Sequence, residues 1–181
     1  MTSPKMKNLR VGVFIDGSNI FWGSKTSGIK IDFEKLKEYL KKYFSPIMFN
    51  YYGCEDNKPN GERYVKSANE QKKFHQNLEN FGYKVIRKDL KHMACGVVKC
   101  DMDIELTMDL RKYENDIDCI ILFTGDSDYL SVVEYYWKSG KYIRIFSFKE
   151  LLAWELKTFT INHPRCNYKL INEIKGKIGR F

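Results

Sequence analysis

The sequence lacks the features that mark secreted, membrane-bound or repetitive proteins. No run approaches the ~18 consecutive apolar residues of a membrane-spanning helix, and the opening MTSPKMKNLR has no apolar signal core. The chain has only four prolines and twelve glycines in 181 residues, and neither an internal repeat nor a low-complexity segment is visible. We therefore expect one globular domain, residues 1–181, in the cytoplasm and without a membrane partner.

Cysteine is present in an odd number and at irregular spacing, which argues against a disulfide framework. The five residues are Cys54, Cys95, Cys100, Cys119 and Cys166. Buried free thiols in a reducing compartment are the preferred interpretation. Cys95 and Cys100, with His92 nearby, are an alternative zinc site, but no second ligand pair accompanies them.

Charge is unevenly distributed along a basic chain. The formal net charge is +8 and the isoelectric point is about 9.1, which favours polyanionic partners. Residues 58–91 hold nine basic side chains against four acidic ones, and residues 149–181 hold seven against three. Residues 100–128 reverse this balance with nine acids. One acidic segment in a basic protein indicates metal-assisted chemistry on an anionic substrate.

Apolar runs of strand length alternate with segments of helical periodicity. The predicted strands cover residues 9–15, 47–52, 83–87, 118–123 and 142–146. The predicted helices cover residues 32–44, with Asp32 as the cap, and residues 62–81, 129–138 and 150–157. The segment from residue 161 is basic and loosely patterned. This alternation predicts an α/β fold with a mostly parallel sheet and helices on both faces.

Two aspartates come directly after the most apolar predicted strands. Asp16 follows residues 9–15, and Asp126 follows residues 118–123 and precedes Asp128. Parallel sheets bind ligands beyond the carboxyl ends of their strands, so we expect these acids to converge. The alternatives are local: Asp16 is a turn residue or helix cap, and Asp128 is a helix cap. Ser18 is a further candidate to cap the first short helix.

Residues 101–110, DMDIELTMDL, fit two structures. Strict polar–apolar alternation is typical of a half-exposed strand, whereas the Met, Glu and Leu content favours a helix. We prefer a helix that begins near Asp101 and has Asp103 in its first turn. The acid there either binds metal or only compensates the helix dipole. Carboxylates held close together repel one another, and Mg²⁺ or Mn²⁺ relieves that repulsion.

Three motifs together resemble the NYN domain family, in particular its LabA-like branch, which is related to PIN-domain nucleases. They are VGVFIDGSN at residues 11–19, MDIELTMDL at residues 102–110 and LFTGDSDY at residues 122–129. The resemblance covers residues 9–148, so residues 149–181 are expected to form a basic C-terminal extension. It implies a PIN-like three-layer α/β/α sandwich and a metal-dependent endoribonuclease in the cytoplasm.

The resemblance also assigns roles to individual residues. It implies that the metal-binding and catalytic acids are Asp16, Asp103, Asp126 and Asp128, that Asn19 orients substrate or water, and that Thr124 lies at the substrate. The second motif departs from the family's common Lys-Gly-Val-Asp form, because Lys99-Cys100-Asp101-Met102-Asp103 has an extra residue and no glycine. Either Asp101 or Asp103 therefore faces the metal, and the spacing to Asp109 favours Asp103. Asp109 itself is assigned a structural role.

RNA, single-stranded or structured, is the expected partner, and a homodimer is left open. Ser18 and the helix lysines Lys66, Lys72 and Lys73 are the candidate substrate contacts. Seven aromatic residues are candidates for base stacking, although most are expected in the core: Tyr51, Tyr52, Tyr64, Phe74, Tyr135, Tyr136 and Trp137.

Three other functions were weighed against the nuclease. A haloacid-dehalogenase-like phosphatase needs a second Asp two residues from the first, but Phe14 and Ser18 occupy those positions. A dinucleotide-binding site is disfavoured because no Gly-rich fingerprint follows the first strand. The remaining alternative is a catalytically silent PIN-like module that binds RNA or protein.

Overall fold

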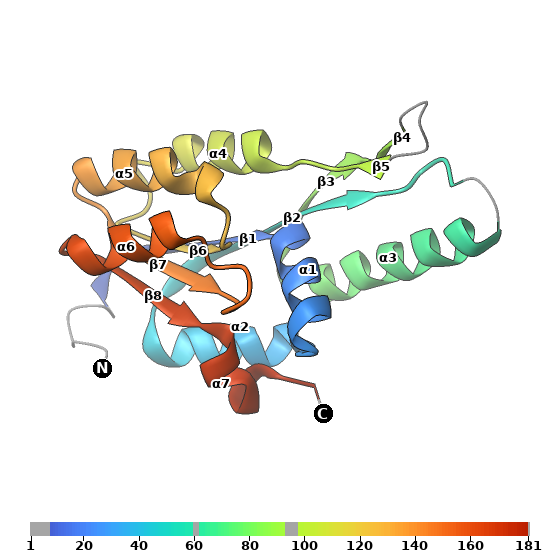
Figure 1. Ribbon diagram of the computed structural model, residues 1–181, viewed down its shortest axis with the longest axis horizontal. Coiled ribbons are helices and arrows are strands. Elements are labelled where there is room, and N and C mark those ends of the chain that lie inside the picture. The colour runs from blue at the N-terminus through green and yellow to red at the C-terminus, as the bar shows by residue number, and fades with distance from the viewer. Residues whose placement is uncertain (1–7, 60–61, 93–97, 181) are drawn as a thin grey trace.

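The computed structural model describes residues 8–59, 62–92 and 98–180, and they form a three-layer α/β/α sandwich (Figure 1). Its centre is a six-stranded parallel sheet in the order β3-β2-β1-β6-β7-β8. The strands are β1 (Val11–Asp16), β2 (Pro46–Glu55), β3 (Lys84–Asp89), β6 (Cys119–Phe123), β7 (Tyr142–Ser147) and β8 (Cys166–Leu170). The fold class predicted from the sequence is confirmed.

The strand order reverses between β1 and β6, and this position determines where a ligand can bind. The chain runs outward from β1 through β2 to β3, then returns to add β6 on the other side of β1 and continues to β7 and β8. Adjacent crossovers therefore leave in opposite directions and open a crevice at the carboxyl ends of β1 and β6. A short hairpin of β4 (Lys91–His92) and β5 (Val98–Lys99) lies outside the main sheet.

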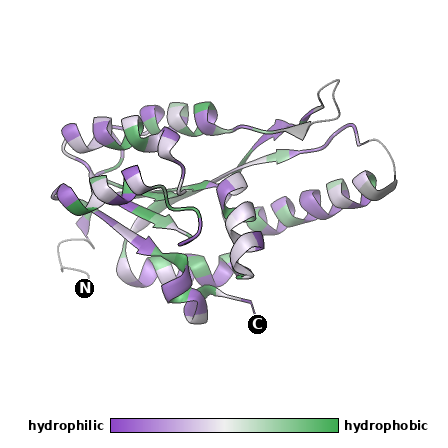
Figure 2. Ribbon diagram, in the orientation of Figure 1, coloured by the Kyte–Doolittle hydropathy of each residue, from purple (hydrophilic) through white to green (hydrophobic). Residues whose placement is uncertain are grey.

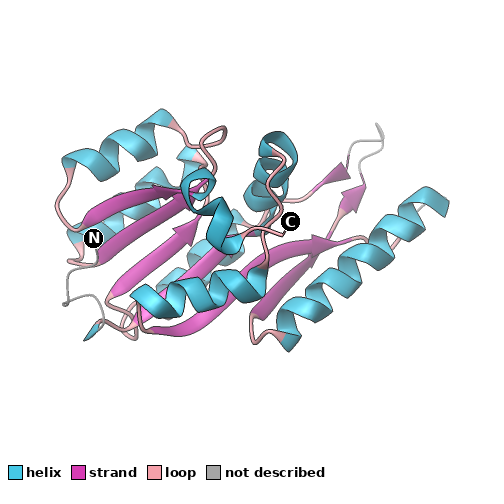
Figure 3. Cartoon of the chain, turned by 90° about the horizontal axis from the view of Figure 1, so that it is seen from below, coloured by secondary structure: helices cyan, strands magenta, loops and turns pink. Residues whose placement is uncertain are grey.

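Seven helices in the described segments cover the sheet on both faces, as Figure 3 shows from a second side. One face packs against α1 (Gly17–Ser27), α2 (Phe33–Tyr43), α3 (Glu62–Asn80) and α7 (Ile171–Ile178). The other face packs against α4 (Asp103–Lys112), α5 (Leu130–Lys138) and α6 (Trp154–Asn162). Hydrophilic residues recur along these outer helices, while the central strands are largely hydrophobic (Figure 2).

Strand β1 illustrates why the predicted apolar run becomes a central strand. Every residue from Val11 to Asp16 is buried. Because successive side chains point to opposite faces, Val11, Val13 and Ile15 enter one core and Phe14 enters the other. A strand covered on both faces needs apolar residues at consecutive positions, and this leaves Asp16 as the first polar group beyond them.

The C-terminal part differs from the sequence prediction. Residues 149–181, expected as a basic extension, contribute α6, the edge strand β8 and α7 to the sandwich. Helix α6 begins at Trp154 rather than at residue 150. Ile171, Ile174 and Ile178 are spaced as one helical face and are buried in the core on the α2 side. Lysines lie between these isoleucines in the sequence, so the short apolar stripe gives only a weak helical pattern.

The prediction that no disulfide forms is wrong for one pair of cysteines. Cys54 near the end of β2 and Cys100 ahead of α4 are joined by a disulfide, with their Cα atoms 6.2 Å apart. Cys119 and Cys166 are free thiols, as expected. Cys100 is not available as a zinc ligand, because its sulfur is bonded to Cys54. Cys95, the other cysteine of the zinc alternative, lies outside the described residues. Among the described helices, none is long and apolar enough to cross a membrane.

Candidate metal centre

Asp16 is the last residue of β1 and the N-cap of α1, and it is held by two hydrogen bonds. Its Oδ1 accepts the backbone N–H of Asn19 at 3.1 Å, so Asp16 rather than the predicted Ser18 caps α1. Its Oδ2 accepts the hydroxyl of Thr124 at 3.1 Å. The side chain is only 5% exposed. A carboxylate this buried is fixed in direction before any ligand arrives.

Thr124 connects the ends of β1 and β6. Besides donating to Asp16, its hydroxyl accepts the backbone N–H of Asp126 at 3.2 Å. The sequence assigned Thr124 to substrate binding, but the residue is 0% exposed and its hydroxyl is bonded within the protein. Thr124 therefore supports the two acids.

The turn after β6 orients Asp126 and Asp128. Asp126 accepts the backbone N–H of Asp128 at 3.0 Å and caps the short 3-10 helix η2 (Ser127–Tyr129). The capping alternative for Asp128 fails, because α5 has no side-chain capping bond at its start. Asp128 thus remains exposed beside the carboxyl end of β6.

Asp103 is the first residue of α4. Its contacts and those of Asp101 indicate which of these two acids faces the other acids. Asp101 is exposed and its carboxylate accepts the backbone N–H of Asp103 at 3.0 Å, so Asp101 acts locally. The Asp103 carboxylate instead accepts the hydroxyl of the buried Tyr129 at 2.6 Å. The preference for a helix at residues 101–110 is confirmed, with α4 covering Asp103–Lys112.

Three of the four predicted acids form one tight cluster. Asp103, Asp126 and Asp128 each offer a carboxylate oxygen, and these oxygens all lie within 4.8 Å of one another. Asp16 is outside this group but is close enough to interact electrostatically with Asp103 and Asp126. The structure thus brings together acids from two loops and one helix that are up to 112 positions apart in sequence, from Asp16 to Asp128.

Burial and mutual repulsion raise the pKa of two of these acids. Desolvation raises the pKa of Asp16 to about 6, with Asp103 and Asp126 adding to the effect against the hydrogen bonds from Asn19 and Thr124. Desolvation likewise raises the pKa of Asp103, and Asp101 and Asp126 add to it. Such a group of oxygen donors fits a hard divalent cation, which offsets the clustered negative charge.

The other predicted site residues lie around this centre in different ways. The Oδ1 of Asn19 accepts the backbone N–H of Gly125 at 3.0 Å, which ties α1 to the turn after β6. Ser18 is exposed on the first turn of α1. Helix α3, which carries none of the clustered acids, exposes Lys66, Lys72 and Lys73.

Asp109 and Tyr129 complete the surroundings of the acids. Asp109 accepts the hydroxyl of Tyr52 at 2.9 Å and pairs with Lys84 at 3.8 Å, consistent with the structural role expected for it. Tyr129 was not singled out from the sequence. It ends the third motif directly after Asp128, and that adjacency was the signal available. Its contact to Asp103 requires the fold.

A parallel sheet with an acid cluster at its switch point is the arrangement expected of a PIN-like nuclease domain. The model of the NYN domain family matches residues 10–161, and the chain therefore belongs to this family. It is 26% identical over 164 residues to the "Low amplitude and bright protein LabA" of Synechococcus elongatus, covering 87% of this chain and 84% of that protein.

A solved structure supports the fold independently. The crystal structure of a protein of unknown function from Vibrio parahaemolyticus superposes with a TM-score of 0.75 at 20% identity. The match covers 99% of this chain and 100% of that one. At this identity the likeness shows the shared fold.

Proposed function

We propose that this protein is a metal-dependent endoribonuclease that hydrolyses RNA phosphodiester bonds at the acid cluster. The observation that carries the proposal is the convergence of Asp103, Asp126 and Asp128 at the switch point of an NYN domain, with their oxygens within 4.8 Å. The basic net charge of +8 supports an anionic substrate.

In this proposal three acids bind the cation and a fourth lies next to it. Asp103, Asp126 and Asp128 would supply hard oxygen ligands to Mg²⁺ or Mn²⁺, and Asp16 lies beside them. When bound, such an ion polarises the phosphodiester, lowers the pKa of an attacking water and stabilises the leaving oxygen. Tyr129 keeps the Asp103 carboxylate oriented through its 2.6 Å hydrogen bond.

Other side chains would position the RNA and the water. The amide NH₂ of Asn19 makes no hydrogen bond to the residues that the structure describes, and its oxygen is fixed by Gly125. It is therefore free to donate to the attacking water or to the phosphate. Ser18 and the exposed lysines of α3, which are Lys66, Lys72 and Lys73, would contact the phosphate backbone on the approach to the site.

The direct test is cleavage of labelled single-stranded RNA in Mn²⁺ or Mg²⁺. We expect the wild type to produce internal cuts, EDTA to abolish them, and Asp126→Asn and Asp103→Asn each to lower kcat by at least about 100-fold. Asp116→Asn is the matched control, because it removes an exposed carboxylate at the opposite end of β6 and should cut like the wild type.

Three results would contradict the proposal. Equal rates for the wild type and both cluster variants on several RNAs would show that the acids do not catalyse. Tight, metal-independent RNA binding without any cleavage would favour a silent binding module instead. Equal cleavage of the matching DNA would reject RNA as the specific substrate class.

A further inference from the structure

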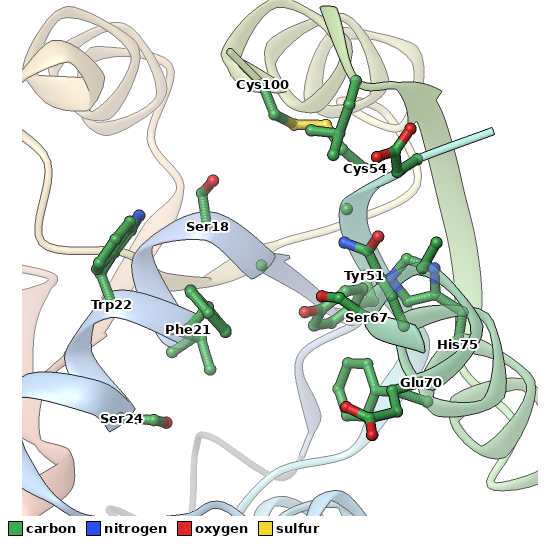
Figure 4. A pocket seen from close by; sticks show the side chains of 18 of the residues that line it. Ser18, Phe21, Trp22, Ser24, Tyr51, Cys54, Ser67, Glu70, His75 and Cys100 are labelled. Atoms are coloured by element: carbon green, nitrogen blue, oxygen red, sulfur yellow. A yellow bond between two sulfur atoms is a disulfide. The ribbon is translucent and has the colours of Figure 1, made fainter. Parts of the chain in front are cut away.

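A cavity beside the acid cluster is built from α1, β2 and α3. Its volume is about 750 Å³, which is within the usual range for small-ligand sites. In Figure 4, Ser18, Phe21 and Trp22 on α1 lie opposite Ser67, Glu70 and His75 on α3, with Tyr51 of β2 between them. We refer to this space as the α1–α3 cavity. The nuclease chemistry proposed above uses none of it except Ser18.

Two buried polar side chains in the wall of the α1–α3 cavity have unused hydrogen-bonding atoms. Tyr51 is 5% exposed and His75 is 2% exposed. His75 Nδ1 lies 2.8 Å from a carboxylate oxygen of Glu55, and Nε2 is the ring nitrogen outside this contact. Within the part of the chain that the structure describes, neither Nε2 nor the Tyr51 hydroxyl has a hydrogen-bond partner.

Two glycines allow the backbone to approach these atoms closely. A side chain at Gly53 would begin 2.8 Å from Nε2 of His75, and one at Gly17 would begin 2.6 Å from the Tyr51 hydroxyl. Both glycines line the α1–α3 cavity. A ligand in this cavity that presents hydrogen-bonding groups to Nε2 of His75 and to the Tyr51 hydroxyl would complete their bonds.

The charges and aromatic rings of the wall define the ligand's chemistry. Among the described lining residues, the permanently charged ones are Lys30, Asp56 and Glu70, one cation against two acids. That balance disfavours a phosphate and favours an uncharged group. Phe21 and Tyr64 are 54% and 55% exposed at the rim, where a flat heterocycle can stack on them.

The α1–α3 cavity is linked to the proposed catalytic centre through the start of α1. Gly17 and Ser18 in its wall follow Asp16 directly in the chain. The negative charge of Asp16 also helps to raise the pKa of Tyr51, after the larger effect of burial, which reports their closeness. A strand whose phosphate lies at the acids therefore has its neighbouring nucleotide at the cavity.

We propose that the α1–α3 cavity is a nucleobase subsite that takes one unpaired base of the RNA next to the scissile phosphate. Every nucleobase carries hydrogen-bond donors or acceptors along its edge. These groups match Nε2 of His75 and the hydroxyl of Tyr51. A base inside the cavity cannot remain paired, so the enzyme selects single-stranded RNA. This inference rests on the proposed nuclease function for the position of the phosphate, but base binding itself does not require cleavage.

The first experiment measures binding without catalysis. The four nucleoside 5′-monophosphates are titrated into the full chain in EDTA, and binding is followed by calorimetry and by NMR. We expect at least one to bind, and Tyr51→Phe and His75→Gln each to weaken its Kd by about tenfold. Ser67→Phe, which fills the cavity from an exposed position, should also weaken it, while Asn69→Phe on the same helix should not.

The second experiment reads base preference during cleavage. A pool of randomised single-stranded RNA is cut in Mn²⁺, and the bases flanking each cut are sequenced. We expect a preference at one position that Tyr51→Phe, His75→Gln and Ser67→Phe flatten and that Asn69→Phe retains. The same sequences annealed into duplexes should resist cleavage.

The outcomes separate the subsite from the nuclease. Binding of a mononucleotide that the cavity variants weaken, without any RNA cleavage, would overturn the nuclease and leave the base subsite standing. RNA cleavage with a base preference that none of the three cavity variants alters would overturn the subsite. Circular dichroism and thermal unfolding show whether each variant is folded, and Ser67→Phe keeps the test valid if a buried substitution unfolds the protein.

Discussion

Asp16 is a carboxylate whose burial opposes its ionisation and so lowers the stability of the fold. Its side chain is almost fully buried, and its partners are one backbone N–H and one hydroxyl instead of a positive charge. A carboxyl group whose folded-state pKa is raised binds its proton more tightly in the native state. Ionisation of Asp16 therefore opposes folding until a cation is bound.

The pH dependence of stability follows from the raised pKa of Asp16. Between the ordinary value of 3.8 and about 6, stability should fall as pH rises, and the contribution should be constant above that range. A shift of this size corresponds to roughly 2–3 kcal/mol. We expect Asp16→Asn to raise the free energy of unfolding in EDTA at pH 7.5 by up to that amount, and to change it little at pH 4.

Urea unfolding with and without Mn²⁺ measures this effect. The wild type should gain stability from Mn²⁺ and Asp16→Asn should gain less, because the variant has lost a charge beside the cation. Asp116→Asn, an exposed acid, serves as the control. A variant less stable than the wild type in EDTA at pH 7.5 would show that Asp16 does not oppose folding.

Tyr129 is predicted to matter through Asp103. Removing its hydroxyl leaves the Asp103 carboxylate without the 2.6 Å hydrogen bond that orients it. We expect Tyr129→Phe to lower Mn²⁺ affinity by about 10–100-fold, as the loss of an outer partner of a metal ligand usually does. Tyr83→Phe removes an equally buried hydroxyl, bonded to the Phe33 carbonyl at 2.7 Å, and should leave Mn²⁺ affinity unchanged in calorimetry.

At the scale of single residues, the sequence predicted the acids better than the hydroxyl groups that hydrogen-bond to them. Asp16 and Asp126 follow strongly apolar strands, so their convergence could be expected from strand ends alone. Thr124 and Tyr129 depend on contacts between elements distant in sequence, and no local pattern specifies which group a hydroxyl will meet.

At the scale of elements, the segment before α4 is held by a covalent bond. Cys100 lies three residues ahead of Asp103 and is joined to Cys54 on β2, with a sequence separation of 46. The disulfide thus fixes the path from the outer strands to the helix that carries Asp103. Spacing alone could not pair these cysteines, because their proximity depends on the tertiary fold.

Breaking this disulfide should weaken the fold. A cross-link that closes a loop of this length contributes about 2–4 kcal/mol, mainly by restricting the unfolded chain. We expect the Cys54→Ser, Cys100→Ser double variant to lose that amount in urea unfolding under non-reducing conditions. The Cys119→Ser variant is the control for a buried free thiol. If peptide mapping of the non-reduced protein found no peptide linking Cys54 to Cys100, the disulfide assignment would be wrong.

The helices and strands were predictable wherever they form a long amphipathic or apolar run. Helix α2 begins after Asp32 as expected, with the Asp32 carboxylate accepting two backbone N–H groups. The end of the chain was harder, because β8 is a short edge strand and α7 has only eight residues. Short elements stabilised by tertiary packing have weak local signals.

At the scale of the whole molecule, the excess positive charge predicts salt-sensitive RNA binding. With single strands, the slope of log K against log salt concentration is about −0.7 per phosphate contact. We expect Asp126→Asn, used to prevent cleavage, to bind RNA with such a slope. In that background we expect the exchange of Lys66, Lys72 and Lys73 for Gln to reduce the magnitude of this slope by roughly 2.

A matched triple variant controls for net charge. Exchange of Lys35, Lys41 and Lys42 on α2 removes the same charge from a different helix of the same face, and it should change the slope less. Equal slopes for the two triple variants would mean that α3 makes no particular phosphate contact. The measurement is a fluorescence-anisotropy titration at several salt concentrations.

The most direct test of the central claim is anomalous diffraction from crystals soaked in Mn²⁺. We expect one or two anomalous peaks bounded by Asp103, Asp126 and Asp128, with metal–oxygen distances near 2.0–2.3 Å. The peaks should disappear in Asp126→Asn crystals soaked in the same way. Mn²⁺ bound elsewhere, or no ion at these acids at saturating Mn²⁺, would contradict a metal centre at the switch point of the sheet.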